Sequence, residues 1–136
     1  DSMSLEVIID NEYATLSYDP ASGIVQHQFH RFIYGNYFRE VLDTVIDLFN
    51  DRGATKWLAD DRLNSTLTTE DAAWAQFDWT PRVWTTGWKY WAVILPDKRV
   101  GQVHLNFSMG LHQGHGIQTA AFENPEHALR WLESVD

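Results

Sequence analysis

The chain contains no cysteine among its 136 residues, which excludes a disulfide framework, a thiolate nucleophile and a cysteine-based zinc site. Positive charge is scarce: ten Lys and Arg stand against nineteen Asp and Glu, for a formal net charge of −9. That balance argues against nucleic-acid binding and against adsorption to anionic membranes. No apolar run approaches the roughly 18 residues of a membrane span, and no signal-peptide layout is present. We therefore expect an acidic, cytoplasmic protein.

The length favours one domain, and the fractions of hydrophobic (44%) and charged (21%) residues are those of a folded protein. Asp1 and Ser2 precede Met3 and have the character of a cloning remnant, so the domain is expected to span residues 3–136. Strands, recognised by alternation or short apolar runs, are expected at 5–9, 13–18, 24–32, 55–59, 89–95 and 116–122. Helices, recognised by apolar spacing or capping residues, are expected at 36–52, 68–87, 100–111 and 124–135.

Several local signals refine these helices. Asn36 is expected to cap the first helix, and Gly53 fits the left-handed residue just past its end. Pro81 is expected to kink or interrupt the second helix, which then either resumes or gives way to an irregular stretch that stops at Gly87. Asn124 should cap the last helix. Residues 112–116 (HQGHG) are expected to form a loop. The apolar period of the third helix is carried by Val100, Val103, Phe107 and Leu111.

Strands that are separated by helices pair in parallel through right-handed crossovers. The sequence therefore predicts a single α/β domain, in which an N-terminal β-hairpin or meander leads into a mixed, mainly parallel sheet with about four helices.

Four stretches carry a resemblance to a known family: 38–40 (FRE), 56–60 (KWLAD) with Arg62, 92–96 (AVILP), and Phe122 with 128–132 (ALRWL). With the order of elements, they resemble the STAS fold of bacterial anti-sigma-factor antagonists. The chain is most similar to the SpoIIAA-like branch, which is itself compared with lipid-binding CRAL–TRIO domains. The resemblance implies a non-catalytic role in bacterial signalling.

Phosphorylatable STAS domains carry a Ser or Thr in an Asp-Ser-Ser-Gly-like turn. The matching turn here, 60–66 (DDRLNST), has no glycine and begins with two acids, so only Ser65 corresponds by rough position. Loops at the carboxyl ends of strands in α/β sheets often bind ligands. We therefore consider this loop a recognition site for a partner or small ligand, formed by Asp60, Asp61, Arg62, Asn64 and Ser65. The alternative is a polar turn with an Asp–Arg pair and an Asn bonded to its own backbone.

The six histidines raise the question of a metal site. His112 and His115 lie three residues apart, with His104 upstream, but a zinc site needs three or four converging ligands. His27 and His30 are expected on opposite faces of a strand. No metal site or cofactor is predicted, and solvated loop histidines are the favoured interpretation.

Catalysis has no motif to support it. The sequence contains no nucleophile elbow, P-loop or dinucleotide fingerprint, and adjacent carboxylates such as Asp60 and Asp61 generally diverge. No catalytic residue is therefore assigned, and the protein is expected not to be an enzyme.

Tryptophan is abundant, with seven residues, five of them between positions 74 and 91. Trp57 and Trp91 lie between apolar neighbours on strands and are predicted to be core. The other members of the run lie on or after a proline-kinked helix that cannot bury them all on one side. They either pack in the core or line a dimer interface or an apolar pocket, with Arg82 as a basic neighbour: Trp74, Trp79, Trp84 and Trp88.

Two functions follow. The first is a regulatory or interaction module of STAS type that binds a protein partner or its own copy through the 74–88 region and the 60–65 loop. The alternative is a carrier of a small apolar, lipid-like ligand. A flat, exposed aromatic patch would favour the partner, whereas a concavity of the same residues would favour the ligand.

Overall fold

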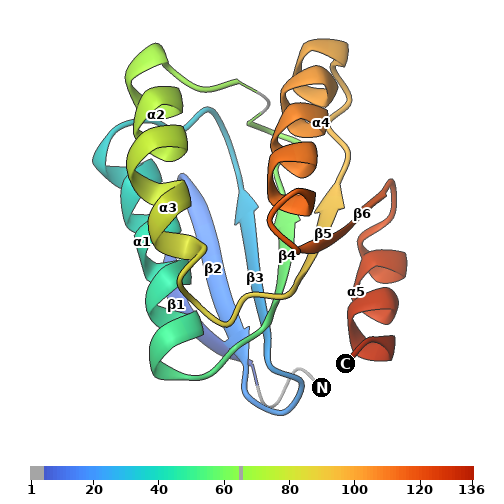
Figure 1. Ribbon diagram of the computed structural model, residues 1–136. Helices are drawn as coiled ribbons and strands as arrows, with labels where there is room; N and C mark the ends of the chain where they lie inside the picture. Colours follow the sequence, from blue (N-terminus) through green and yellow to red (C-terminus); the bar gives the residue numbers. More distant parts are fainter. Residues whose placement is uncertain (1–4, 65) are drawn as a thin grey trace.

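The computed structural model describes residues 5–64 and 66–136, and its centre is a six-stranded sheet whose strands lie side by side in chain order (Figure 1). The strands are β1 (Glu6–Asp10), β2 (Ala14–Asp19), β3 (Ile24–Phe29), β4 (Lys56–Asp60), β5 (Tyr90–Ile94) and β6 (Gln118–Phe122). The helices are α1 (Asn36–Asp51), α2 (Thr69–Trp74), the π-helix η2 (Ala75–Trp79), α3 (Thr80–Val83), α4 (Arg99–Gln113) and α5 (Pro125–Ser134).

The sheet is mixed. β1, β2 and β3 form an antiparallel meander, and β3, β4, β5 and β6 run parallel to one another. The turn between β2 and β3 uses Gly23 at φ 74°, a conformation that side chains disfavour. The predicted fold class, an α/β mixed sheet entered through an N-terminal meander, is confirmed, with strand ends shifted by at most three residues.

The entrance to α1 differs from the prediction by one residue. Gly35, at φ 62°, is the N-cap, and Asn36 is the first helical residue, so the expectation that Asn36 caps the helix was wrong. The chain needs a positive φ at this point, which glycine supplies. The Gly35 carbonyl then accepts the first helical hydrogen bond, from the Arg39 N–H at 3.0 Å. At the other end Gly53 adopts φ 69°, as predicted.

Residues 69–83 form one continuous helical segment with a widened turn in its middle. Thr68 caps it, and its side chain accepts from the Asp71 N–H at 3.1 Å. In the π-helix η2 the Thr80 N–H bonds to the Ala75 carbonyl, five residues back. The disturbance predicted at Pro81 is therefore a π turn just before the proline. The helix ends at Val83, and an irregular stretch leads to Gly87, which is one of the two courses expected.

Helix α4 is present as predicted, but the face it buries is not the predicted one. Val100, Val103 and Phe107 are 49%, 61% and 63% exposed. The buried residues of α4 are Gly101, Leu105 and His112, so the apolar period identified the helix and misplaced its inner face. The helix also continues through His112, which corrects the loop predicted at 112–116.

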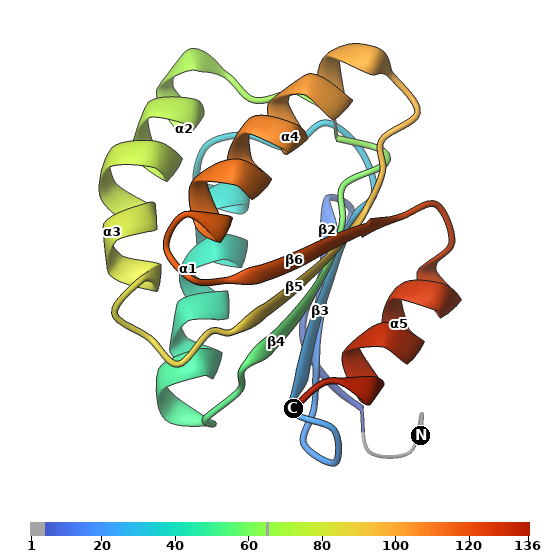
Figure 2. The ribbon, with the colours of Figure 1, turned by 45° about the vertical axis from the view of Figure 1, so that its right-hand side comes forward.

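The helices divide between the two faces of the sheet. α1, the 69–83 segment and α4 lie over one face, and α5 lies over the other (Figures 1 and 2). Asn124 caps α5 as predicted, accepting from the Glu126 N–H at 2.8 Å. Among the described residues, no helix has the length and apolar character needed to cross a membrane.

Candidate ligand-binding cavity

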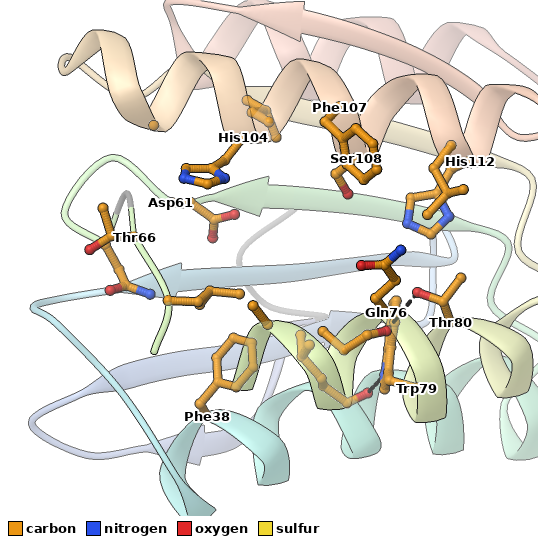
Figure 3. Close-up of a pocket in the computed structure, with 18 of the residues that line it drawn as sticks. Phe38, Asp61, Thr66, Gln76, Trp79, Thr80, His104, Phe107, Ser108 and His112 are labelled. Atoms are coloured by element: carbon orange, nitrogen blue, oxygen red, sulfur yellow. Dashed lines mark hydrogen bonds between the residues drawn. The ribbon is translucent and has the colours of Figure 1, made fainter. Parts of the chain in front are cut away.

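A cavity of about 450 Å³ lies on the helix-rich face, between the 69–79 helical segment and α4 (Figure 3). Its floor comes from the sheet, with Phe29 on β3, Trp57 on β4 and Trp91 on β5. Helix α1 adds Phe38 and Leu42 to the wall. The volume lies within the range of roughly 300–1,000 Å³ that is usual for small-molecule sites.

The cavity opens to solvent between the two helical walls. Its lining includes residues that are exposed and so mark the mouth: Leu67, Ala72, Gln76, His104 and Phe107. The residues below them are buried in the aromatic core, among them Trp57, Trp79 and Trp91. The arrangement is therefore an aromatic hollow with a mixed polar and apolar rim.

The π turn of η2 places three side chains on this wall. Trp79 is buried, and its Nε1–H donates to the Leu42 carbonyl at 2.8 Å, which fixes the indole against α1. The Thr80 hydroxyl donates to the Ala75 carbonyl at 2.7 Å. Gln76 and Thr80, four residues apart, both line the cavity (Figure 3). π turns of this kind are frequent at functional sites because they re-aim side chains.

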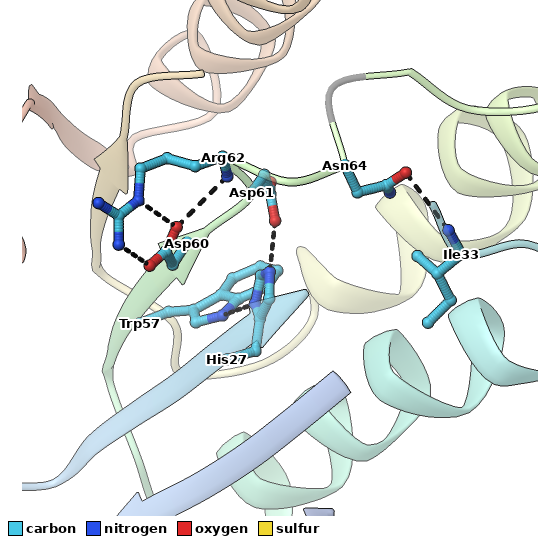
Figure 4. A network of polar contacts seen from close by, with 7 residues as sticks. All are labelled: His27, Ile33, Trp57, Asp60, Asp61, Arg62 and Asn64. Atoms are coloured by element: carbon cyan, nitrogen blue, oxygen red, sulfur yellow. Dashed lines mark hydrogen bonds and ion pairs between the residues drawn. The ribbon is translucent and has the colours of Figure 1, made fainter. Parts of the chain in front are cut away.

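His27 stands on the floor beside an aspartate (Figure 4). The Trp57 Nε1–H donates to His27 Nδ1 at 2.9 Å, so Nδ1 supplies the lone pair and Nε2 carries the proton. Nε2 lies 2.6 Å from Asp61 Oδ1 and donates to it. Both ring nitrogens are therefore engaged inside the protein, which leaves His27 no free lone pair for a substrate proton.

His112 lies on the opposite wall. The Trp84 Nε1–H donates to His112 Nδ1 at 3.0 Å, so its Nε2 also carries the proton. Burial lowers the pKa of His112 to about 4, and repulsion from His115 acts in the same direction. At neutral pH the ring is therefore an uncharged donor.

The charge of the cavity is simple. Within the described residues no Lys or Arg lines it, and the one formal charge is the Asp61 carboxylate. The hollow thus suits an uncharged, largely apolar molecule.

The predicted 60–65 loop is divided between two faces of the sheet. Asp61 and Asn64 line the cavity, and the Asn64 side chain accepts from the Ile33 N–H at 3.4 Å rather than bonding within its own loop. Asp60 and Arg62 form a two-pronged ion pair at 2.9 and 2.7 Å (Figure 4). That pair borders a separate polar recess of about 290 Å³ with Thr15. Ser65 lies outside the described residues.

The four tryptophans predicted as one partner or pocket region do not act together. Trp79 and Trp88 are each 4% exposed and so belong to the core, one of the two alternatives expected for this run, and of the four only Trp79 lines the cavity. Trp74 is half-buried beneath the Arg39 and Arg82 guanidinium groups. Trp74 and Trp79 lie five residues apart on the helical segment and so point in different directions, whereas Trp84 and Trp88 follow the end of the helix at Val83.

The remaining predicted residues lie outside the helical wall of the cavity or in the core. Trp84 is half-buried and stacks on His115 at 4.0 Å between ring centroids. Arg82 bonds to Asp43 and Asp78 at 2.8 and 3.0 Å on the surface. Trp57 and Trp91 are buried, as predicted.

The expectation of a solvated loop histidine was wrong for His112, and His27, expected on a strand, is buried as well. His27 and His112 are 4% and 3% exposed. His27 shares a strand face with Val25 and Phe29, and this alternation is a signal that could have placed it in the core.

In the part of the chain that is described, no three His, Asp or Glu side chains converge as metal ligands would. Gln76 and Ser108 also line the cavity, with no sequence signal to single them out, and so does His104, which the sequence suggested only as a possible metal ligand.

Comparison with known proteins gives no relative to set beside this geometry: no family model, curated protein or solved structure matches the chain at a significant level. The resemblance to STAS domains therefore stays an expectation of the sequence analysis.

Proposed function

We propose that this protein binds a small, largely apolar molecule in the cavity between the 69–79 helical segment and α4. The observation that carries the proposal is the aromatic hollow itself, of about 450 Å³, open at a rim of exposed side chains. Buried aromatic walls bind apolar molecules because the ligand loses its contact with water without displacing packed side chains. Of the two functions derived from the sequence, this supports the carrier.

The burial of the tryptophans supports the same choice. A partner surface in the 74–88 region would need exposed indoles, yet Trp79 and Trp88 are buried within the chain. The contacts of the two buried histidines support binding rather than catalysis. Both nitrogens of His27 are occupied, and the proton of His112 lies on the nitrogen that Trp84 does not contact.

A second candidate function rests on the exposed face of α4. Val100, Val103 and Phe107 are spaced three and four residues apart and are all exposed, which is unusual for one helical stripe. Such a face would serve an interaction module of STAS type that binds a protein or a second copy, with Phe107 shared by the cavity rim. A bacterial, cytoplasmic setting remains part of the proposal.

Titration with N-phenyl-1-naphthylamine, an uncharged apolar fluorophore, tests the binding function. We expect saturable binding of one molecule per chain, with a rise in probe fluorescence and quenching of tryptophan emission. Ser108 lines the cavity from α4, so Ser108→Phe should fill the hollow and weaken binding about tenfold or more.

The matched control is Asn106→Phe, which adds the same ring to an exposed position of α4 outside the cavity lining. It should leave the affinity within twofold of the unmodified protein. Equal affinity for the probe in both variants would mean that the fluorophore binds elsewhere and would remove the proposal. Native mass spectrometry of the gently purified protein would add the mass of any ligand that it carries.

A further inference from the structure

We propose that the ligand carries an uncharged hydrogen-bond acceptor, a carbonyl or ether oxygen, and that the Nε1–H of Trp91 and the Nε2–H of His112 bind it. This inference rests on the proposed function and names the chemical class of the molecule that the cavity takes.

The first observation is the indole of Trp91. Four tryptophans are buried, and three of them donate within the protein: Trp57 to His27, Trp79 to the Leu42 carbonyl, and Trp88 to the Tyr90 carbonyl. Trp91 is 5% exposed and lines the cavity. Its Nε1 is the one buried side-chain nitrogen or oxygen in the described chain that has no hydrogen-bond partner. Buried donors are normally satisfied, so this one indicates a missing acceptor.

The surroundings of Trp91 explain why the protein supplies no acceptor itself. Its nearest aromatic neighbours are Trp57, Trp88 and His112, with ring centroids 5.8, 5.7 and 5.3 Å away. None of these rings offers an oxygen, and the lone pair of His112 is already used by Trp84. The structure thus leaves Trp91 Nε1 without an acceptor, and a ligand in the cavity that this ring lines can supply one.

The second observation is the orientation of His112. Because Nδ1 accepts from Trp84, Nε2 is a donor; no hydrogen bond from it is found among the described residues, and unlike Trp91 Nε1 this atom is not fully buried. The His112 ring lies perpendicular to Trp91, at 89°, and both rings line the cavity. An oxygen has two lone pairs and accepts two hydrogen bonds, so a single ligand atom matches this pair of donors.

The charges of the residues that line the cavity favour an uncharged polar group on the ligand. A carboxylate would meet the Asp61 charge, with no Lys or Arg of the described lining to offset it. An ammonium group would bring further hydrogen-bond donors to a site that already has two. The one carboxylate that could pair with it, Asp61, already accepts from His27. A ketone, ester or ether oxygen satisfies both donors without either penalty.

Displacement of N-phenyl-1-naphthylamine by 2-nonanone and by nonane tests this assignment, since the two molecules differ in the carbonyl group. Trp91→Phe keeps an aromatic ring and removes the N–H. We expect it to weaken binding of 2-nonanone about tenfold while the affinity for nonane changes less than twofold. Trp131→Phe, on α5 and outside the cavity, should leave both affinities unchanged.

A spectroscopic measurement on the unmodified protein keeps the test decisive even if Trp91→Phe fails to fold. The indole ¹H–¹⁵N signal of Trp91 should move downfield when 2-nonanone is added and should not do so with nonane. If both molecules displace the probe and the Trp91 signal responds identically, the cavity binds apolar molecules and the assignment of the acceptor is wrong. Tighter binding of nonanoate or nonylammonium than of 2-nonanone would also overturn it. If none of the four displaces the probe, the proposed function fails as well.

Discussion

The two faces of the sheet are packed in different ways. Under α1, the 69–83 segment and α4, the core is rich in wide rings, including Phe49, Trp57 and Trp88, which lie 5.3–6.3 Å apart between centroids. Under α5 the buried set is mainly aliphatic: Ile24, Leu58, Ala92, Ile94, Ala128 and Leu132, with Tyr90. The cavity lies on the first face. The cavity is therefore surrounded by rings that pack in offset or edge-to-face pairs of defined geometry.

The faces also differ in how their helices are held. On the ring-rich side, indole N–H groups bond to backbone carbonyls and histidines, and a buried carboxylate joins two helices. On the other side α5 is held by aliphatic packing, together with the Lys56 ammonium, which donates to the Leu132 and Val135 carbonyls at 2.7 Å each. Directed hydrogen bonds can fix a wall around a hollow, which packing alone would close.

Substitution of Asp71, the buried carboxylate on the ring-rich face, should cause the largest loss of stability. Asp71 is 1% exposed and accepts from the Gly35 N–H at 2.8 Å and from Arg39 Nε at 3.1 Å, which ties α2 to the entrance of α1. Asp71→Ala leaves these donors without a partner, so we expect the free energy of unfolding to fall by about 4 kcal/mol in urea denaturation. Asp78→Ala, on an exposed ion pair, is the control and should cost about 0.5 kcal/mol or less. Similar losses in both variants would refute a structural role for the buried carboxylate.

Truncation of one leucine on each face of the sheet compares how tightly the two faces are packed. Leu132 is fully buried against the aliphatic face, so Leu132→Ala should lower the free energy of unfolding by about 3 kcal/mol. Leu105 borders the existing cavity, where truncation enlarges an open space, and Leu105→Ala should cost about 2 kcal/mol or less. Urea denaturation of both variants measures the difference. A greater loss at Leu105 would mean that the ring-rich face is as tightly filled as the other.

The smallest expected effect is a change in the free energy of unfolding with pH. Because burial lowers the pKa of His112 to about 4, the unfolded chain binds a proton at this residue more readily than the folded one. Acidification below the ordinary pKa therefore favours unfolding, and the contribution of His112 should fall by about 1–2 kcal/mol between pH 7 and pH 5.

Denaturation of the unmodified protein and of His112→Phe across this range isolates the contribution, since the other titrating groups are common to both. The difference in stability between the two should shift in favour of the variant as the pH falls. A difference that stays constant with pH would show that His112 titrates normally.

More of the fold than of the candidate site could be predicted from the sequence. Period and capping residues located the helices, because a strong signal such as Asn124 before Pro125 acts over a few neighbouring residues. Helix α4 shows where that reasoning fails: Val100, Val103 and Phe107, which define its apolar period, are exposed, and its buried residues are Gly101, Leu105 and His112. Which side of a helix meets the sheet depends on residues far apart in the chain, and periodicity does not contain that information.

The same cause explains what was missed in the cavity. The 60–65 loop was expected to act as one unit, yet Asp61 faces the hollow and Asp60 with Arg62 faces the opposite side. The pairing of His27 with Asp61 spans 34 positions, and that of Trp84 with His112 spans 28. Neither pairing follows from local spacing.

The order of strands has a consequence for synthesis. Because spatial order repeats chain order, each strand leaving the ribosome finds its partner in the strand made just before it, and the sheet can grow at one advancing edge. Each pairing closes only the loop between neighbours, which keeps the entropic cost of every step small. Helix α5 is made after all six strands and closes the aliphatic face, so the two halves of the core are completed at different times.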